Sequence, residues 1–162
     1  MKGTVMKRDE TDVKILEILQ REGRTRNTDL ADVVGLSLPA VSERLKKMEE
    51  SGVIRGYYAR LDHQMLGKDV TAFVVVTVDS SKHFASFAEH AAHIVEIQEC
   101  HAITGEGTHL IKIRTENTKE LEKLLAKIKS WQGVMTTTTS IVLSTSKEST
   151  SIKICTNGEG AL

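Results

Sequence analysis

The sequence lacks several features that mark secreted, membrane-bound or metal-holding proteins. Among its 162 residues it has only two cysteines, Cys100 and Cys155, whose separation fits no metal or redox spacing and is typical of free thiols in a reducing cell interior. No apolar run reaches the roughly 18 residues of a membrane span, and the first ten residues have no apolar signal core. These absences predict a soluble chain in the cytoplasm.

The sequence also lacks an excess of charge of either sign, since 22 Lys and Arg residues balance 22 Asp and Glu residues. A protein that holds polyanions without sequence preference usually carries a positive excess, so this balance counts against a non-specific binder of nucleic acid. Positive charge is nonetheless gathered between residues 44 and 60, where Glu49 and Glu50 are the only acids. The cations of this stretch are Arg44, Lys46, Lys47, Arg55 and Arg60.

Catalytic and metal-binding patterns are absent as well. The sequence has no Ser/His/Asp or Cys/His triad, no pair of carboxylates at neighbouring strand ends and no glycine-rich loop between a strand and a helix. His90 and His93 are three residues apart on a helical pattern, but no third and fourth ligand stands at a known spacing. We therefore predict no metal, no cofactor and no enzyme.

What the sequence does contain is a pattern of two short helices joined by a turn, at residues 27–54. Small residues stand at 31 and 35, where two helices would cross closely. Ser37 followed by Pro39 marks the start of the second helix, because Ser caps a helix and Pro needs no N–H in its first turn. The inner positions of that helix are apolar and the outer ones are mostly cationic, which is the helix-turn-helix pattern of a helix that enters the major groove of DNA.

The neighbouring residues extend this pattern into a three-helix unit. A preceding helix, capped by Asp9 or Thr11, is expected to run to about Arg21. The two helices that follow are expected at roughly 28–34 and 38–50.

The predicted DNA contacts fall into base readers and phosphate contacts. Ser42 and Arg44 are the candidate base readers, because a hydroxyl reads several base edges and Arg pairs bidentately with guanine. The lysines of the second helix, and the arginines of an extended strand or wing expected over 53–61, are candidate phosphate contacts. The alternative, a surface helix with a solvated charged face, is disfavoured by the turn and the apolar framework. The predicted DNA-binding residues are Asn27, Thr28, Ser37, Leu38, Pro39, Ser42, Glu43, Arg44, Lys46, Lys47, Arg55, Tyr57 and Arg60.

From residue 70 the pattern changes to strands and helices in the order βαββαβ, the ferredoxin-like arrangement of an antiparallel sheet with both helices on one face. Residues 70–78 are apolar on both faces, as in a strand covered on two sides. We therefore predict an α+β fold in which a second copy of the chain covers the bare sheet face, as a face-to-face homodimer. The expected elements are a strand at 70–78, a helix at 81–92, strands at 94–104 and 108–115, a helix that starts at Asn117 and closes at Gly133, and a strand at 135–143.

These patterns divide the chain into four parts. They are a helix-turn-helix DNA-binding domain at 1–60, a linker at 61–69, a ferredoxin-like effector and oligomerisation domain at 70–145, and a tail at 146–162. The tail is rich in Ser, Thr, Lys and Gly, and its one strand-like run, 151–155, either adds an edge strand to a partner or stays disordered.

Three segments, taken together, carry a resemblance to a known family: DETDVKILEILQ at 9–20, NTDLADVVGLSLPAVSERLKKMEESGVI at 27–54 and TGEGTHLIKI at 104–113. With the βαββαβ order they resemble the Lrp/AsnC (feast/famine) family of bacterial and archaeal transcription regulators over roughly residues 8–145. The resemblance implies a DNA-binding domain, a linker and a ligand-sensing domain that dimerises and builds octamers or similar rings. It also implies an amino-acid effector bound between dimers near the turn at 104–110, and hence a sequence-specific regulator at the nucleoid.

The turn at 104–109 departs from the family pattern in one respect. The resemblance implies Gly-acid-aromatic-Asp-aromatic, with the Asp suited to a ligand amino group, but here the acid is Glu106 and the later Asp is Thr108. A ligand ammonium would lose a charge-assisted hydrogen bond worth about 1.5–3 kcal/mol, which leaves open a different ligand or none. The candidate effector-binding residues are Thr104, Gly105, Glu106, Gly107, Thr108, His109, Thr136 and Thr138.

Each of these candidates also has a plainer interpretation. Gly105 and Gly107 are typical of a hairpin turn that needs positive φ, and alternate threonines at 136–139 are typical of an exposed sheet face. His109 is either a sensor of pH or of a ligand carboxylate, or an ordinary surface histidine. For the whole chain, the alternatives are an effector-independent DNA-architectural protein of the same fold and a small-molecule enzyme or carrier built on the βαββαβ half.

Overall fold

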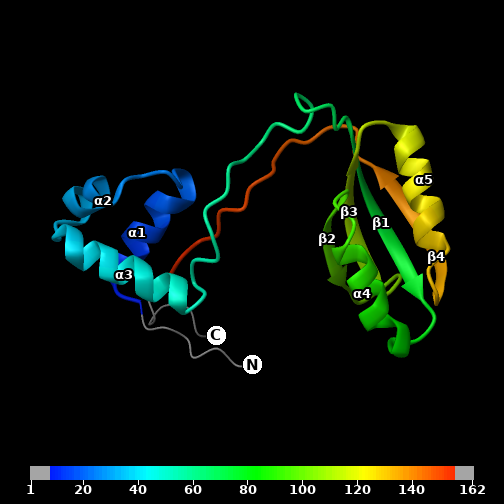
Figure 1. Cartoon of the computed structure of the whole chain (residues 1–162), viewed down its shortest axis with the longest axis horizontal. Helices are drawn as coiled ribbons and strands as arrows, with labels where there is room; N and C mark the ends of the chain where they lie inside the picture. The colour runs from blue at the N-terminus through cyan, green and yellow to red at the C-terminus, as the bar shows by residue number, and fades with distance from the viewer. Residues whose placement is uncertain (1–7, 156–162) are drawn as a thin grey trace. The chain divides into compact units, whose positions relative to one another are not determined.

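The computed structural model describes residues 8–155, which form two units (Figure 1). The helical unit comprises residues 8–60 and 147–155, and the sheet unit comprises residues 61–146. Each unit has its own cluster of buried apolar side chains. Residues 1–7 and 156–162, which the predicted DNA-binding domain and tail include, lie outside the described residues.

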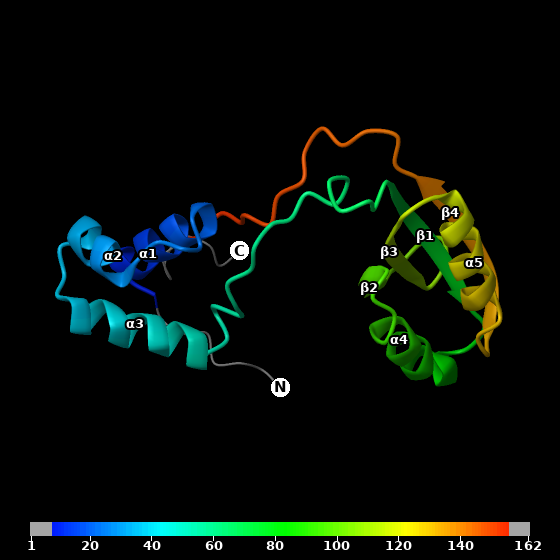
Figure 2. The same cartoon turned by 45° about the horizontal axis from the view of Figure 1, so that its top comes forward.

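The described part of the helical unit contains the three predicted helices, α1 (Glu10–Arg21), α2 (Asn27–Val34) and α3 (Leu38–Glu50). The predicted caps are confirmed: Asp9 Oδ1 accepts from the Asp12 N–H at 2.8 Å, and Ser37 Oγ accepts from the Ala40 N–H at 3.4 Å. α3 forms one side of the unit, and α1 and α2 lie together on the other (Figure 2). The core side chains come from all three helices and are Ile15, Leu16, Leu30, Ala31, Val41, Leu45 and Met48.

The segment after α3 is irregular, whereas the sequence predicts an extended strand over 53–61. Val53 and Ile54 pack against the helical core as predicted, and the Ile54 N–H donates to Met48 O at 3.0 Å. Residues 55–60 continue as exposed backbone with no strand beside them in the described part of this unit. An extended segment needs such a neighbour to form a sheet, so none forms here.

The described residues of the tail, 147–155, pack on the helical unit, a contact that the sequence did not predict. Gln20 of α1 binds both backbone groups of Ile152: its Nε2 donates to Ile152 O at 3.1 Å, and its Oε1 accepts from the Ile152 N–H at 2.7 Å. Ile154 packs against the helical core. The chain therefore passes between the two units twice, once before the sheet and once after it.

The sheet unit has the predicted βαββαβ order. Its elements are β1 (Val70–Val78), a 3₁₀ turn (Ser81–His83) leading into α4 (Phe84–Ala92), β2 (Ile97–Ala102), β3 (His109–Thr115), α5 (Thr118–Lys129) and β4 (Val134–Ile141). The strands are antiparallel in the order β2-β3-β1-β4, so β1 lies between β3 and β4 (Figure 1). Asn117 caps α5 as predicted, but α5 ends at Lys129 rather than at Gly133, and β2 begins at Ile97 rather than at residue 94.

The two faces of the sheet differ in burial. Alternate residues of β1, from Ala72 to Val78, are buried in one core with side chains of α4 and α5, so both helices cover the same face. Phe73, which points the other way, is 38% exposed. We call this second side the open face, and its residues on three neighbouring strands are Phe73, Val75, Thr77, Leu110, Lys112, Thr136, Thr138 and Ser140.

Neither cysteine forms a disulfide, and none of the described helices is a membrane span. Cys100 and Cys155 are free and half-buried, and burial raises the pKa of the Cys100 thiol. Across residues 8–155, no helix is both long and apolar enough to span a bilayer.

Candidate nucleic-acid interface and effector turn

α3 has the two faces that a recognition helix needs. Val41, Leu45 and Met48 follow helical spacing and are buried in the helical core. The opposite face is exposed and carries four of the predicted contacts, Ser42, Glu43, Lys46 and Lys47. The apolar stripe therefore fixes the helix on its unit, while hydrogen-bonding and charged groups remain accessible.

A groove of about 310 Å³ lies beside the exposed face of α3. It brings together four predicted DNA-binding residues, from α2, α3 and the following segment: Asn27, Ser42, Lys46 and Tyr57. The Tyr57 hydroxyl donates to Glu49 Oε1 at 3.0 Å, and burial together with this bond raises the pKa of Tyr57 to about 12. Tyr57 is therefore a protonated donor at neutral pH, and Glu49 is a groove residue that the predicted set lacks.

Asn27 and Thr28 lie in the exposed first turn of α2. The N-cap residue, Arg26, supplies no side-chain cap, and its guanidinium pairs with Asp29 instead, Nη2 to Oδ1 at 2.9 Å. The first backbone N–H groups of α2 therefore keep hydrogen-bonding capacity for solvent or for an anion such as a phosphate.

The start of α3 is exposed at Ser37, Leu38 and Pro39. The Ser37 hydroxyl serves as the cap, and the Leu38 side chain is 44% exposed. An apolar side chain at the tip of such a helix suits contact with a thymine methyl group, and the cap keeps that tip helical.

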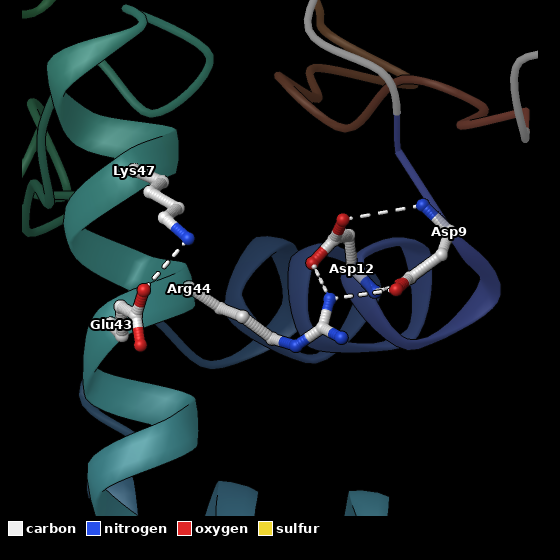
Figure 3. Close-up of polar contacts among 5 residues, drawn as sticks. All are labelled: Asp9, Asp12, Glu43, Arg44 and Lys47. Atoms are coloured by element: carbon white, nitrogen blue, oxygen red, sulfur yellow. Dashed lines mark hydrogen bonds and ion pairs between the residues drawn. The ribbon is translucent and has the colours of Figure 1, made fainter.

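The exposed lysines of α3 have only exposed partners. Lys47 Nζ lies 2.7 Å from Glu43 Oε1, and Lys46 Nζ lies 3.8 Å from Glu50 Oε1 (Figure 3 shows the first pair). The Lys47 ammonium holds the pKa of Glu43 below its usual range. Exposed ion pairs are weak and screened by salt, so a phosphate can take the place of either carboxylate.

Arg55 and Arg60 lie on the irregular segment after α3, and both are exposed. Arg60 Nη2 lies 3.6 Å from Glu148 Oε2 of the tail. The tail thus reaches the segment that carries two of the predicted phosphate contacts.

Arg44 differs from the other predicted contacts on α3, because its side chain turns toward α1 (Figure 3). Its Nη1 lies 2.8 Å from Asp9 Oδ2 and 2.7 Å from Asp12 Oδ1. The Asp12 N–H and the Arg44 guanidinium hold the pKa of Asp9 below its usual range. The structure therefore separates Arg44 from the exposed face on which a base reader is expected.

The turn at 104–108 uses its two glycines differently. The Ile103 N–H donates to Thr108 O at 3.0 Å and closes the turn. Both glycines have positive φ, but a Cβ on Gly105 would meet nothing within 4 Å, whereas a Cβ on Gly107 would overlap Val75 Cγ1. Gly105 thus leaves its backbone open, and Gly107 lets the turn lie against β1.

Thr108 is bonded within the protein. Its N–H donates to Val76 O at 2.9 Å, and its hydroxyl accepts from the Val78 N–H at 3.0 Å and lies 3.1 Å from Val76 O and 2.9 Å from His109 Nδ1. These contacts fix the turn to the end of β1. They also use the hydroxyl that stands where the family resemblance places a ligand-binding Asp.

His109 is a core residue, so the prediction of a surface histidine is wrong. Its side chain packs between two aromatic rings of α4, with ring centroids 4.8 Å from Phe84 and 4.6 Å from Phe87, and the residue is 3% exposed. Burial lowers the pKa of His109. A ligand outside the turn would therefore not reach this ring without a rearrangement.

The remaining effector candidates are exposed. Thr104, Gly105 and Glu106 lie at the tip of the turn, and Thr136 and Thr138 lie on the open face of β4. Thr136 is paired with Thr77, next to the β1 residues that bind the turn. The two groups of candidates therefore flank the same end of β1.

His90 lies in α4, and His93 is the residue that follows the end of this helix. His93 Nδ1 lies 2.7 Å from Glu89 O, and the His90 ring lies 5.2 Å from that of Trp131. Among the residues that the structure describes, no cluster of three or more His, Cys, Asp or Glu side chains could hold a metal ion.

Two family models match the chain in the order of its two units. Residues 8–55 match a winged helix-turn-helix DNA-binding domain, and residues 71–152 match the Lrp/AsnC ligand-binding domain. The chain belongs to the Lrp/AsnC family of transcription regulators. As a regulator of this type it uses a helix-turn-helix to bind DNA, and its sheet unit is the Lrp/AsnC ligand-binding domain.

Lrp/AsnC relatives match both in sequence and in structure. The HTH-type transcriptional regulator FL11 from Pyrococcus horikoshii is 39% identical over 146 residues, which cover 90% of this chain and 96% of the relative. The leucine-responsive regulatory protein of Haemophilus influenzae is 37% identical over 143 residues, covering 86% of each chain. Among solved structures, the L-Met complex of a transcriptional regulator from Neisseria meningitidis has a TM-score of 0.85 at 31% identity, covering 90% of this chain and 96% of that one. AsnC from E. coli has a TM-score of 0.82 at 29% identity, with coverages of 88% and 97%.

Proposed function

We propose that this Lrp/AsnC regulator binds specific duplex sequences as a homodimer through α3, and that an amino acid or a related small molecule bound at the turn 104–108 modulates this binding. The observation that supports DNA binding most directly is the exposed face of α3 above its buried stripe. The groove beside it gathers hydrogen-bonding and cationic side chains from three segments. A helix fixed and flanked in this way suits the major groove.

The side chains divide between base and phosphate contacts by exposure and chemistry. Ser42 is the candidate base reader, since its hydroxyl lies on the exposed face of α3. Lys46, Lys47, Arg55 and Arg60 are the candidate phosphate contacts, and the first turn of α2 supplies backbone N–H groups for a further phosphate.

Selection of duplexes from a randomised library by the wild-type protein tests this assignment. We expect a recurrent sequence with two half-sites about 34 Å apart, or a multiple of that distance. Ser42→Ala should lose about 0.5–1.5 kcal/mol of discrimination, the contribution of one neutral hydrogen bond, at one base pair of each half-site. Lys47→Ala should weaken binding to all duplexes alike and reduce the slope of log K on log salt by about one.

An exposed lysine of α5 provides the matched control, because Lys127→Ala removes the same charge from the sheet unit and should change neither quantity. A library that yields no recurrent sequence, together with a steep salt slope, would favour a DNA-architectural protein instead.

The open face supports the homodimer. It exposes part of Phe73 at its centre, next to Val75 and Leu110, and a second copy of the same face would remove these side chains from water. Sedimentation velocity should therefore show dimers, or multiples of dimers up to the octamer. Phe73→Lys should shift the distribution toward monomers, and an unchanged distribution would argue against this interface.

The effector site is supported by an open backbone beside a carboxylate. Gly105 leaves room above the main chain, and the neighbouring Glu106 is exposed and can pair with an ammonium group. The L-Met complex of the Neisseria meningitidis relative favours amino acids as the class of ligand.

Thermal unfolding in the presence of each common amino acid tests the effector site. A ligand at one hundred times its Kd should stabilise the protein by about 2.7 kcal/mol. At the same ligand concentration Glu106→Gln should reduce this stabilisation by about 0.2–1 kcal/mol, whereas Glu122→Gln, an exposed carboxylate on α5, should leave it unchanged. DNA binding without a shift for any amino acid would indicate an effector-independent regulator.

A further inference from the structure

Arg44 joins the middle of α3 to the first turn of α1. Asp9 and Asp12 form the capping box of α1, in which Asp9 Oδ1 accepts from the Asp12 N–H and Asp12 Oδ2 accepts from the Asp9 N–H at 3.2 Å. Each carboxylate turns its other oxygen to Arg44 Nη1, so the cap and the arginine form one hydrogen-bonded group (Figure 3). We call these three residues the Arg44 cluster.

Burial distinguishes the Arg44 cluster from the other ion pairs of α3. The side chains of Asp12 and Arg44 are 5% and 32% exposed, whereas those of Glu43 and Lys47 are 67% and 61% exposed. A buried carboxylate that loses its partner is strongly unfavourable. Orientations of α3 in which Arg44 leaves Asp12 are therefore rarely populated, and the cluster restrains α3 against α1.

We propose that Arg44 is a positioning residue, which acts on DNA through Asp12 by holding α3 at the angle at which Ser42 and Lys46 meet the duplex, and which reads no base itself. This inference rests on the proposed DNA contact by α3. A base reader contributes at one base pair, whereas a positioning residue contributes to every contact of its helix at once. Breaking the cluster from either side should therefore weaken binding to all duplexes alike.

Two conservative substitutions break the cluster from opposite sides. Arg44→Met keeps much of the aliphatic stem, and Asp12→Asn keeps one oxygen for the Asp9 N–H. Asp12 is buried, and its carboxylate would be repelled by the phosphates of DNA, so Asp12→Asn cannot act by removing a direct contact between Asp12 and DNA. We expect each variant to weaken binding on the order of tenfold, and the double variant to be no weaker than the more affected single one, because both remove the same restraint.

Fluorescence anisotropy with the duplex selected by the wild-type protein, and with each of its single-base-pair variants, measures these effects. A uniform and non-additive loss supports positioning. If Arg44→Met relaxes the preference at one base pair and Asp12→Asn does not, Arg44 reads that base and the proposal is overturned. Failure of the wild-type protein to select any duplex would instead refute the proposed function, before any variant is compared.

The salt dependence separates positioning from phosphate contact. Removing a phosphate contact lowers the slope of log K on log salt by about one, which is the expectation for Lys47→Ala on the exposed flank of the same helix. Arg44→Met should leave the slope unchanged. A slope reduced as in Lys47→Ala would overturn the proposal.

A purely structural role is tested by measuring affinity at a temperature where circular dichroism shows every variant to be folded. If the unfolding midpoint falls while the affinity of the folded variants equals that of wild type, the cluster only stabilises the fold and the proposal is overturned. Should Arg44→Met not fold, Asp9→Asn removes one of the two contacts from a carboxylate that is 52% exposed. That variant should show a smaller uniform loss of affinity, and wild-type affinity would overturn the proposal.

Discussion

An added methyl group should affect the two glycines of the 104–108 turn very differently. Gly105 and Gly107 have φ of +101° and +77°, so alanine at either position costs about 1–2 kcal/mol of backbone strain. At Gly105 the methyl group meets nothing within 4 Å, whereas at Gly107 it overlaps Val75 Cγ1 and lies 3.1 Å from Val76 O. Crowding of this kind costs about a further 1–3 kcal/mol, so Gly107→Ala should be the more destabilising change by that amount.

Thermal unfolding of both variants at one protein concentration measures this difference. A loss of 1 kcal/mol lowers Tm by about 4–8 °C in a unit of this size, so Gly107→Ala should unfold at least roughly 5 °C below Gly105→Ala. Equal midpoints, or a lower midpoint for Gly105→Ala, would refute the argument that Val75 and Val76 leave no room. The same geometry makes Gly105→Asp the suitable variant for blocking an effector while DNA binding persists, whereas Gly107→Asp should damage the sheet unit itself.

Two further predictions concern the tail and the buried histidine. Ile154→Ala should lower the free energy of unfolding of the helical unit by about 1–2 kcal/mol and Gln20→Ala by about 1 kcal/mol; urea denaturation that shows no change would contradict the packing of the tail. Because burial holds the pKa of His109 below its ordinary value, the unfolded chain takes up that proton first as the pH falls below about 6.5. The free energy of unfolding should therefore decline between about pH 7 and pH 5, and His109→Gln should flatten this decline; an equal slope in the variant would exclude His109 as its source.

The parts of the fold that the sequence predicts well have local causes. The side chains of Asp9, Ser37 and Asn117 each accept a hydrogen bond from the backbone N–H three residues later. Four consecutive residues therefore determine where α1, α3 and α5 begin. The end of α5 has no such local cause. Trp131 continues the apolar spacing of the helix but lies beyond its last residue, and it reaches the core from the turn, with its ring centroid 5.3 Å from that of Phe87. Periodicity counts apolar residues and does not say where the backbone leaves the helix.

The candidate DNA interface is predictable as a set of residues, but the direction of a long side chain is harder to predict. Arg44 is polar like Glu43 and Lys46, which are exposed. It differs in that it lies three residues after Val41 and four before Met48, which are both buried. It therefore borders the apolar stripe of α3, as Asp12 borders that of α1 three residues before Ile15. When two helices pack through their apolar stripes, oppositely charged residues that border those stripes are close enough to form an ion pair. The spacing of Arg44 and Asp12 from buried residues therefore predicts their contact, which their polarity alone does not.

Register also predicts more about His109 than residue type does. His109 stands two residues before Ile111 and four before Ile113, and the period of a strand places all three on the buried face. The prediction of a surface position follows from the polarity of the side chain and overlooks this register. By contrast, nothing local in the sequence indicates that Gln20 binds Ile152, because that contact joins residues 132 positions apart.

Thr108 stands where the family resemblance places an Asp, and its hydrogen bonds affect the proposed effector site. The Thr108 hydroxyl is already bonded to β1, so in the proposed effector site a ligand ammonium would pair with the exposed Glu106 instead. Exposed ion pairs are typically worth about 0.2–1 kcal/mol, compared with about 1.5–3 kcal/mol for a charge-assisted hydrogen bond. For the proposed effector site, the difference corresponds to roughly a tenfold weaker Kd than an Asp partner at this position would give. Thr108→Asp should therefore not restore tight binding by itself, because it removes the hydroxyl that donates to Val76 O and places a carboxylate against that carbonyl oxygen.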